Sequence, residues 1–254
     1  MVGVDDASSG TSDSVEAKTG AVKRSPVIVV CSPRPRVGRT LVARLLVDYF
    51  LADDRSVVAF DANPNDPVLS EYLPGHAIPA TIADTRGQMA LFDRLIVNIG
   101  VPKVIDLAAE QYSQFFDIVE QIDFVDEARQ RGIDSVFMFV TEDHPKSVEA
   151  YQKMLRRFPK ATVVPVHNEI FENLGKTSQS HPAKGSLPVH VPQLPTLLFG
   201  VIYHPGFSIA EFLKRPSDFP TMLHKWTSQP FIAFRDLELR LAMADFLPLF
   251  RLEA

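Results

Sequence analysis

The chain has 254 residues, of which 46% are hydrophobic and 22% charged, and its formal net charge is −5 at pH 7. These values are ordinary for a folded protein and exclude a disordered chain, a collagen and a small disulfide scaffold. The mild negative charge argues against a protein that coats nucleic acid over its whole surface. The length suits one α/β domain or two small ones.

The first 24 residues are mostly Ser, Gly, Thr, Asp and Lys. Such a segment buries too little apolar surface to offset its ordering entropy, so we expect a disordered tail, with the fold beginning at Pro26. This N-terminus lacks the apolar stretch of a secretory signal, and no segment approaches the ~18–20 uninterrupted apolar residues of a membrane-spanning helix. We therefore expect a cytoplasmic protein, in which the single Cys31 is a core residue.

The first predicted strand, 27–31, is a continuous apolar run, which is typical of a strand buried on both faces. A loop rich in Pro and Arg follows, and then an amphipathic helix at 40–51. The same alternation continues along the chain. The further strands that we expect are 57–61, 103–107, 136–140, 162–166 and 196–203, and the further helices are 87–99, 113–131, 145–158, 209–215 and 231–246.

This alternation predicts an α/β fold with a doubly wound, mostly parallel sheet. We expect the α/β domain to cover 25–215 and a C-terminal helical extension to cover 216–254. Pro165 places the strand at 162–166 near an edge of the sheet. The loop at 173–195 has a length that is usually functional or mobile.

The loop after the first strand is where a parallel sheet usually binds its ligand. Here it reads SPRPRVGRT, from Ser32 to Thr40, and leads directly into a helix. In a phosphate-binding loop, glycines let backbone amides converge on phosphate, Lys reaches the β- and γ-oxygens, and Ser or Thr binds magnesium. The helix dipole adds a favourable field. On these residues alone, a turn without a ligand is an equally good interpretation.

The segment from Arg34 to Thr40 resembles the deviant Walker A motif KGGVGKT of the ParA/MinD-type ATPases, in the CobQ/CobB/MinD/ParA superfamily of P-loop proteins. Three further landmarks occur in the same order as in that family. They are the segment Asp61–Asn65 after the second strand, Asp106 at the end of the third and Asn168 after the fifth. A narrower resemblance, to the TraL-like proteins of conjugative transfer, rests on Asp106–Glu110 and His167–Glu169.

The resemblance implies a SIMIBI-like P-loop fold and an ATP- and Mg²⁺-dependent switch that dimerises around its nucleotide. It implies that Arg39 contacts the β- and γ-phosphates, that Thr40 and Asp106 serve the magnesium, and that Asp61 helps to organise metal and water. Arg34 would act on the partner's nucleotide and Asn168 would contact the base. The remaining loop residues that the resemblance assigns to the nucleotide are Arg36, Val37 and Gly38.

Departures from the family motif predict weaker phosphate contacts and slower nucleotide hydrolysis. Arg stands at both lysine positions, and Pro35 lacks an N–H for phosphate. Arg36 carries a steric cost if the loop needs positive φ there. Asn63 stands where many relatives have a second aspartate that positions water. We therefore expect hydrolysis to be slow or absent, and the alternative function is a non-hydrolysing pseudo-ATPase that acts as an interaction protein.

Several residues keep a simpler interpretation beside the functional one. Asp61 can cap a turn, Glu110 can interact with a helix dipole, and Asn168 can satisfy loop backbone groups. The histidines show no zinc-ligand spacing. The C-terminal helix has no basic face, so we expect it to pack on the sheet or on a partner chain rather than on a membrane. Exposure of Trp226 and Phe231 would favour the partner chain.

We expect a homodimer and an unidentified protein partner. DNA is an alternative partner, because a basic patch combines Lys153, Arg156, Arg157 and Lys160. These four side chains can equally form a solvated helix face.

Overall fold

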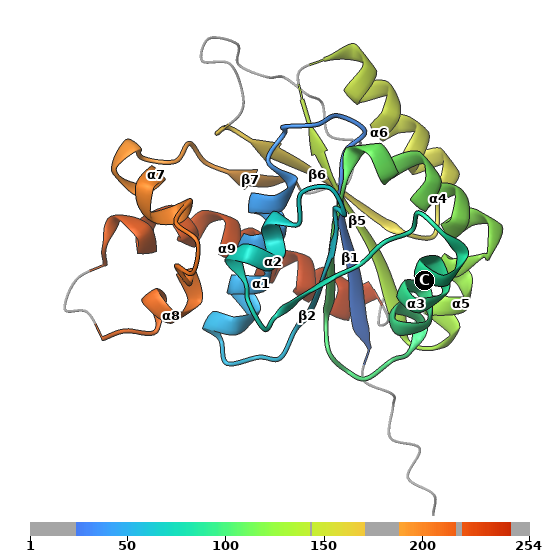
Figure 1. Cartoon of the computed structure of the whole chain (residues 1–254), viewed down its shortest axis with the longest axis horizontal. Helices are drawn as coiled ribbons and strands as arrows, with labels where there is room; N and C mark the ends of the chain where they lie inside the picture. Colours follow the sequence, from blue (N-terminus) through green and yellow to red (C-terminus); the bar gives the residue numbers. More distant parts are fainter. Residues whose placement is uncertain (1–23, 143, 171–187, 217–219, 245–254) are drawn as a thin grey trace, which may run out of the picture.

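The structure, a computed structural model, describes residues 24–142, 144–170, 188–216 and 220–244. It contains a seven-stranded, all-parallel sheet with the strand order β3-β2-β4-β1-β5-β6-β7 (Figure 1). The predicted doubly wound α/β class is therefore confirmed. The strands are β1 (Ser25–Cys31), β2 (Val58–Ala62), β3 (Ala77–Pro79), β4 (Lys103–Leu107), β5 (Ile133–Thr141), β6 (Thr162–Asn168) and β7 (Val189–Val191).

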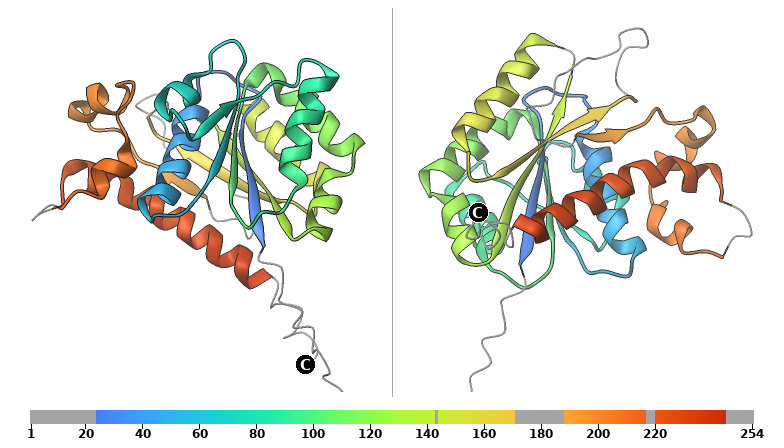
Figure 2. Two further views of the ribbon diagram at one scale, coloured as in Figure 1. Left: turned by 60° about the horizontal axis from the view of Figure 1, so that its bottom comes forward. Right: turned by 180° about the vertical axis from the view of Figure 1, so that it is seen from behind.

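Helices cover both faces of this sheet, as Figure 2 shows in its left view. One face carries α1 (Arg39–Ala52), α2 (Val68–Tyr72), α7 (Thr196–Ile202), α8 (Ile209–Leu213) and α9 (Met222–Ala244). The other carries α3 (Thr85–Ile96), α4 (Tyr112–Gln121), α5 (Phe124–Gln130) and α6 (Pro145–Arg157). A short 3₁₀ helix, Ala109–Gln111, precedes α4.

Alternate residues of β1 supply the two cores that lie between the sheet and these helices. Ile28 and Val30 pack in the core under α1, whereas Val27, Val29 and Cys31 pack in the opposite core. This division follows from the two-residue period of a strand. Cys31 is fully buried, as expected of a core residue, and burial raises the pKa of its thiol.

The C-terminal helix α9 packs against α1 and β7. Trp226 is only 4% exposed, its indole N–H donates to the carbonyl of Pro192 at 3.0 Å, and Phe231 is partly buried against the core, so the exposure that would favour a partner chain is not seen. The helix also begins nine residues before the predicted start at 231 and runs through Pro230. Within the described residues, no helix combines the length and hydrophobicity needed to cross a membrane.

The predicted strand at 196–203 is wrong, because this apolar segment forms helix α7. The last strand of the sheet is the short β7, and β6 lies beside it, so the predicted position of Pro165 near an edge is confirmed. Pro165 lies before the part of β6 that pairs with β7, which starts at Val166. The predicted helix at 113–131 is also divided, because Asp123 has a φ of 52° between α4 and α5.

Three short elements, α2, β3 and β7, were not predicted, and β7 lies within the predicted loop at 173–195. The predicted tail lies outside the described residues except for Arg24, which pairs with Asp134. Most of the predicted loop at 173–195 and the last two residues of the predicted helix at 231–246 also lie outside them.

Candidate functional site

The strand order brings the loops after β1, β2 and β4 to one edge of the sheet. Strand β4 lies between β2 and β1, and its Asp106 is in register with Asp61 on one side and Val30 on the other. The chain leaves β1 toward α1 on one face and leaves β4 toward α4 on the opposite face. Such a divergence opens a crevice at the carboxyl edge of a parallel sheet, where ligands bind.

The loop between β1 and α1 uses two left-handed backbone positions. Arg36 has a φ of 60° and Gly38 a φ of 83°. The positive φ of Arg36 confirms the predicted steric cost at this position. A residue with a Cβ carries about 1–2 kcal/mol of strain in the left-handed region. Gly38 caps α1 without a side-chain hydrogen bond. Within the described part of the chain, no backbone carbonyl accepts from the backbone amides of residues 36–38.

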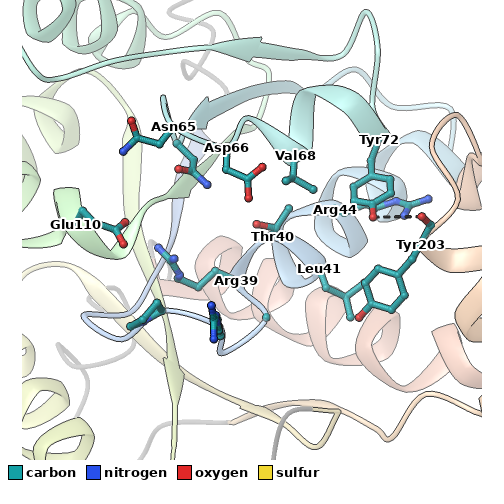
Figure 3. A pocket seen from close by; sticks show the side chains of 14 residues that line it. Arg39, Thr40, Leu41, Arg44, Asn65, Asp66, Val68, Tyr72, Glu110 and Tyr203 are labelled. Atoms are coloured by element: carbon teal, nitrogen blue, oxygen red, sulfur yellow. Dashed lines mark hydrogen bonds between the residues drawn. The ribbon is translucent and has the colours of Figure 1, made fainter.

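A pocket of about 620 Å³ lies over this N-terminal end of α1 (Figure 3). Its walls come from the β1–α1 loop, the segment after β2, the start of the 3₁₀ segment after β4, and the end of α7. The lining residues are Pro35, Arg36, Gly38, Arg39, Thr40, Leu41, Arg44, Asn63, Asn65, Asp66, Val68, Tyr72, Glu110 and Tyr203. The structure thus brings four of the residues predicted to hold a nucleotide or its metal, Arg36, Gly38, Arg39 and Thr40, to one cavity.

Arg39 and Thr40 connect this pocket to the buried Asp106. The Arg39 guanidinium donates to the carbonyl of Leu107, and the Asp106 and Glu110 carboxylates favour its charge. The Thr40 hydroxyl lies near the Asp106 carboxylate and acts to lower its pKa. Burial is the main cause that raises the pKa of Asp106 to about 6, and the Asp61 charge adds to it. Thr40 and Arg39 oppose this rise.

Asp61 and Asp106 lie behind the pocket and do not line it. One Asp61 carboxylate oxygen accepts from the Ser70 amide at 2.9 Å, and the other is buried without a partner among the described residues. Burial raises the pKa of Asp61. The turn-capping interpretation of Asp61 therefore describes the contact that this carboxylate makes here.

Three other predicted site residues have roles beside the pocket rather than in it. Val37 is buried, and its carbonyl accepts from the Asn168 side-chain amide at 3.0 Å. Asn168 therefore satisfies loop backbone, which was the alternative to contact with a base. Arg34 pairs with Glu142 and does not line the pocket of its own chain.

No sequence motif points to the other end of the pocket, which Arg44, Tyr72 and Tyr203 form. Arg44 is 1% exposed and donates to the carbonyls of Ile202 and Phe207. It also lies 3.7 Å from Asp48, one turn further along α1. A charged pair four residues apart in an otherwise apolar helix was the available signal.

The Thr40 hydroxyl and the Asp106 carboxylate offer oxygen atoms, which are the ligands that magnesium takes. The Thr40 side chain lines the pocket, with the Asp106 carboxylate directly behind it. Magnesium in phosphate sites keeps several waters and takes few protein ligands. The described residues contain no group of three or more His, Cys, Asp or Glu side chains that could hold a metal.

Comparison with models of known protein families and with curated protein sequences gives no match. The fold and the site therefore define the class of this protein by themselves. It is a doubly wound α/β protein with a large pocket at the N-terminus of the helix that follows its central strand.

Proposed function

We propose that the chain binds ATP in this pocket and acts as a ParA/MinD-like nucleotide-binding switch whose hydrolysis is slow or absent. The observation that carries the proposal is the pocket itself, in which Arg36, Arg39 and Thr40 surround the first turn of α1. A helix N-terminus offers backbone donors and a positive dipole, and the two arginines add charge, so the site favours a polyphosphate.

Each residue then has a stated task. The Arg39 guanidinium binds phosphate oxygens, for which it has spare N–H donors beside the one that contacts Leu107. Thr40 and Asp106 would hold the magnesium, which neutralises phosphate charge when it is bound. Val37 and Asn168 keep the loop in shape through their hydrogen bond.

Slow hydrolysis follows from the carboxylates near the pocket. Asp61 is turned toward the Ser70 amide, and Asn63 lines the pocket in place of an acid. An amide orients water but does not accept its proton as a carboxylate does. The dimer, a role of Arg34 across it, an unidentified protein partner and a cytoplasmic location remain predictions.

The second candidate function is a pseudo-ATPase that works as an interaction protein. Its support is the internal pairing of Arg39, whose guanidinium already bonds to Leu107 and lies near Asp106 and Glu110. In the pseudo-ATPase, the Arg39 guanidinium is occupied by these contacts within the chain. The pocket then binds no nucleotide.

Thermal unfolding with and without ATP and Mg²⁺ separates the two functions. A ligand at 100 times its Kd stabilises a folded protein by about 2.7 kcal/mol, which raises the midpoint visibly. We expect this rise in the wild type and its loss in Arg39→Ala. The matched control is Arg157→Ala, an arginine on the opposite face of the sheet. No rise in the wild type would reject nucleotide binding and favour the pseudo-ATPase.

DNA as a partner has less support from the structure. Arg157 pairs with Asp117 and Glu120, and Lys160 pairs with Asp126, so acidic side chains neutralise half of the basic patch. We expect no salt-dependent shift of DNA mobility, and a clear shift that weakens with salt would reverse this assessment.

A further inference from the structure

The pocket has two chemically different ends. Arg39 and Glu110 lie at one end, with Thr40 and Asp66 between them and the centre (Figure 3). Leu41, Val68, Tyr72 and Tyr203, which are apolar or aromatic, lie at the other end beside Arg44. A bare polyphosphate would use only the charged end.

The Tyr72 ring is fixed in place by its neighbours. The Arg44 guanidinium carbon lies 4.4 Å from the ring centroid, and the Tyr72 hydroxyl donates to the carbonyl of Tyr203 at 3.4 Å. Arg44 is in turn held by the carbonyls of Ile202 and Phe207. The ring thus lines the pocket with little freedom left to lose, which is the condition for a good stacking platform.

The residue that the family resemblance assigns to the base is already engaged elsewhere. Asn168 is 2% exposed, its amide nitrogen donates to Val37, and its amide oxygen accepts from the Ile170 amide at 3.3 Å. It does not line the pocket. A base bound in this pocket therefore needs a different contact.

We infer that the base of the bound nucleotide lies at the aromatic end of the pocket and stacks on Tyr72, with Tyr203 closing the same end. The inference rests on the proposed function and deepens it, because it names the residues that distinguish a nucleotide from a bare polyphosphate. Stacking on an aromatic side chain is tolerant of base identity, since every base has a π-face. The site thus selects a flat ring joined to phosphates and discriminates weakly between bases.

The test compares the affinities of ATP and inorganic tripolyphosphate in the wild type, Tyr72→Leu, Tyr72→Phe and Tyr203→Leu. Wild type binds ATP more tightly than tripolyphosphate by roughly tenfold or more, which is the size of one base–aromatic stack. Tyr72→Leu loses this preference while its tripolyphosphate affinity stays the same. Tyr72→Phe keeps the preference, because the ring remains. Tyr203→Leu lowers the preference for ATP in part. Because Tyr203 is exposed, this variant should fold and keeps the test available if Tyr72→Leu does not fold.

The matched control is Tyr112→Leu, a partly buried tyrosine on the opposite face of the sheet, which leaves both affinities unchanged. Equal binding of ATP and tripolyphosphate by the wild type overturns the inference and leaves phosphate binding in place. An ATP preference that survives in both leucine variants also overturns it. If neither ligand binds the wild type, the proposed function itself fails.

Discussion

Two arginines five residues apart on α1 have similar partners and different surroundings. Arg44 is buried, and it bonds to the carbonyls of Ile202 and Phe207 beside the buried Asp48. Arg39 bonds to the carbonyl of Leu107 near the buried Asp106, and although both arginines line the pocket, only Arg39 is partly exposed there.

This difference indicates that Arg44 and Asp48 stabilise the fold, whereas Arg39, beside Asp106, is able to bind a ligand. Asp48 accepts from the Ala210 amide, so Arg44 and Asp48 together fasten the α7–α8 segment to α1. Every partner of Arg44 is another part of the chain. Arg39 has a single hydrogen-bonded carbonyl among the described residues, and its remaining donors lie where a ligand can reach them.

The largest effect on stability should come from Arg44→Ala. The substitution leaves Asp48 as a buried charge without compensation and removes the donors for two carbonyls. Breaking a buried pair in this way costs about 3–5 kcal/mol. Urea unfolding measures the loss, and the joint replacement Arg44→Met with Asp48→Leu should recover much of it. A loss below about 1 kcal/mol would show that the pair does not hold α7 and α8.

The pH dependence of stability tests the surroundings of Asp106. Its folded pKa of about 6 exceeds the ordinary 3.8, so the native state keeps this proton after the unfolded state has lost it. Stability from this group is therefore present at low pH and is lost as the pH rises through about 6. Such a difference between the folded and unfolded pKa corresponds to about 2–3 kcal/mol of the free energy of unfolding.

The variant Asp106→Asn does not titrate at this position and serves as the reference. From pH 4 to pH 7.5, the wild type should lose about 2 kcal/mol relative to it, as measured by urea unfolding at each pH. Parallel pH profiles of the two proteins would contradict the raised pKa.

Arg39→Ala should affect stability far less than Arg44→Ala, by about 1 kcal/mol, because the residue is partly exposed and its lost hydrogen bond is replaced by water. Its effect on ATP affinity should be tenfold or more, since a charge-assisted phosphate contact disappears. Unfolding and ATP titration of the same preparation measure both. A large loss of stability with unchanged ATP affinity would reverse the roles of the two arginines.

The smallest effect should come from Arg157, a half-buried arginine whose carboxylate partners are exposed. It forms ion pairs with the exposed carboxylates of Asp117 and Glu120 on the opposite face of the sheet. Exposed pairs contribute about 0.2–1 kcal/mol, so Arg157→Ala should change the free energy of unfolding by less than 1 kcal/mol. A loss as large as that of Arg44→Ala would show that burial does not explain the difference between the arginines.

The sequence was informative where an element is long or apolar throughout. The strand predicted at 27–31 lies within β1, because all five of its residues are apolar. The segment 196–203 was misread because a short apolar run fits a buried strand and a helix equally well. Its exposed Leu197 and Phe199 show that it is a surface helix, and this exposure is set by tertiary packing.

The site was predictable only where neighbours in sequence are neighbours in space. The pocket residues from Arg36 to Thr40 belong to one loop, and their positions followed from that loop. Tyr203 reaches the pocket only because Arg44 ties the end of α7 to α1. The hydrogen bond between Asn168 and Val37 joins residues that no local pattern connects.

Equilibrium dialysis with labelled ATP and Mg²⁺ tests the central claim most directly, with the wild type and Arg39→Glu compared side by side. The account predicts saturable binding of about one ATP per wild-type chain and none in the charge-reversed variant, because its phosphate contact becomes repulsive. Absence of saturable binding to the wild type, or equal binding by both proteins, would contradict it.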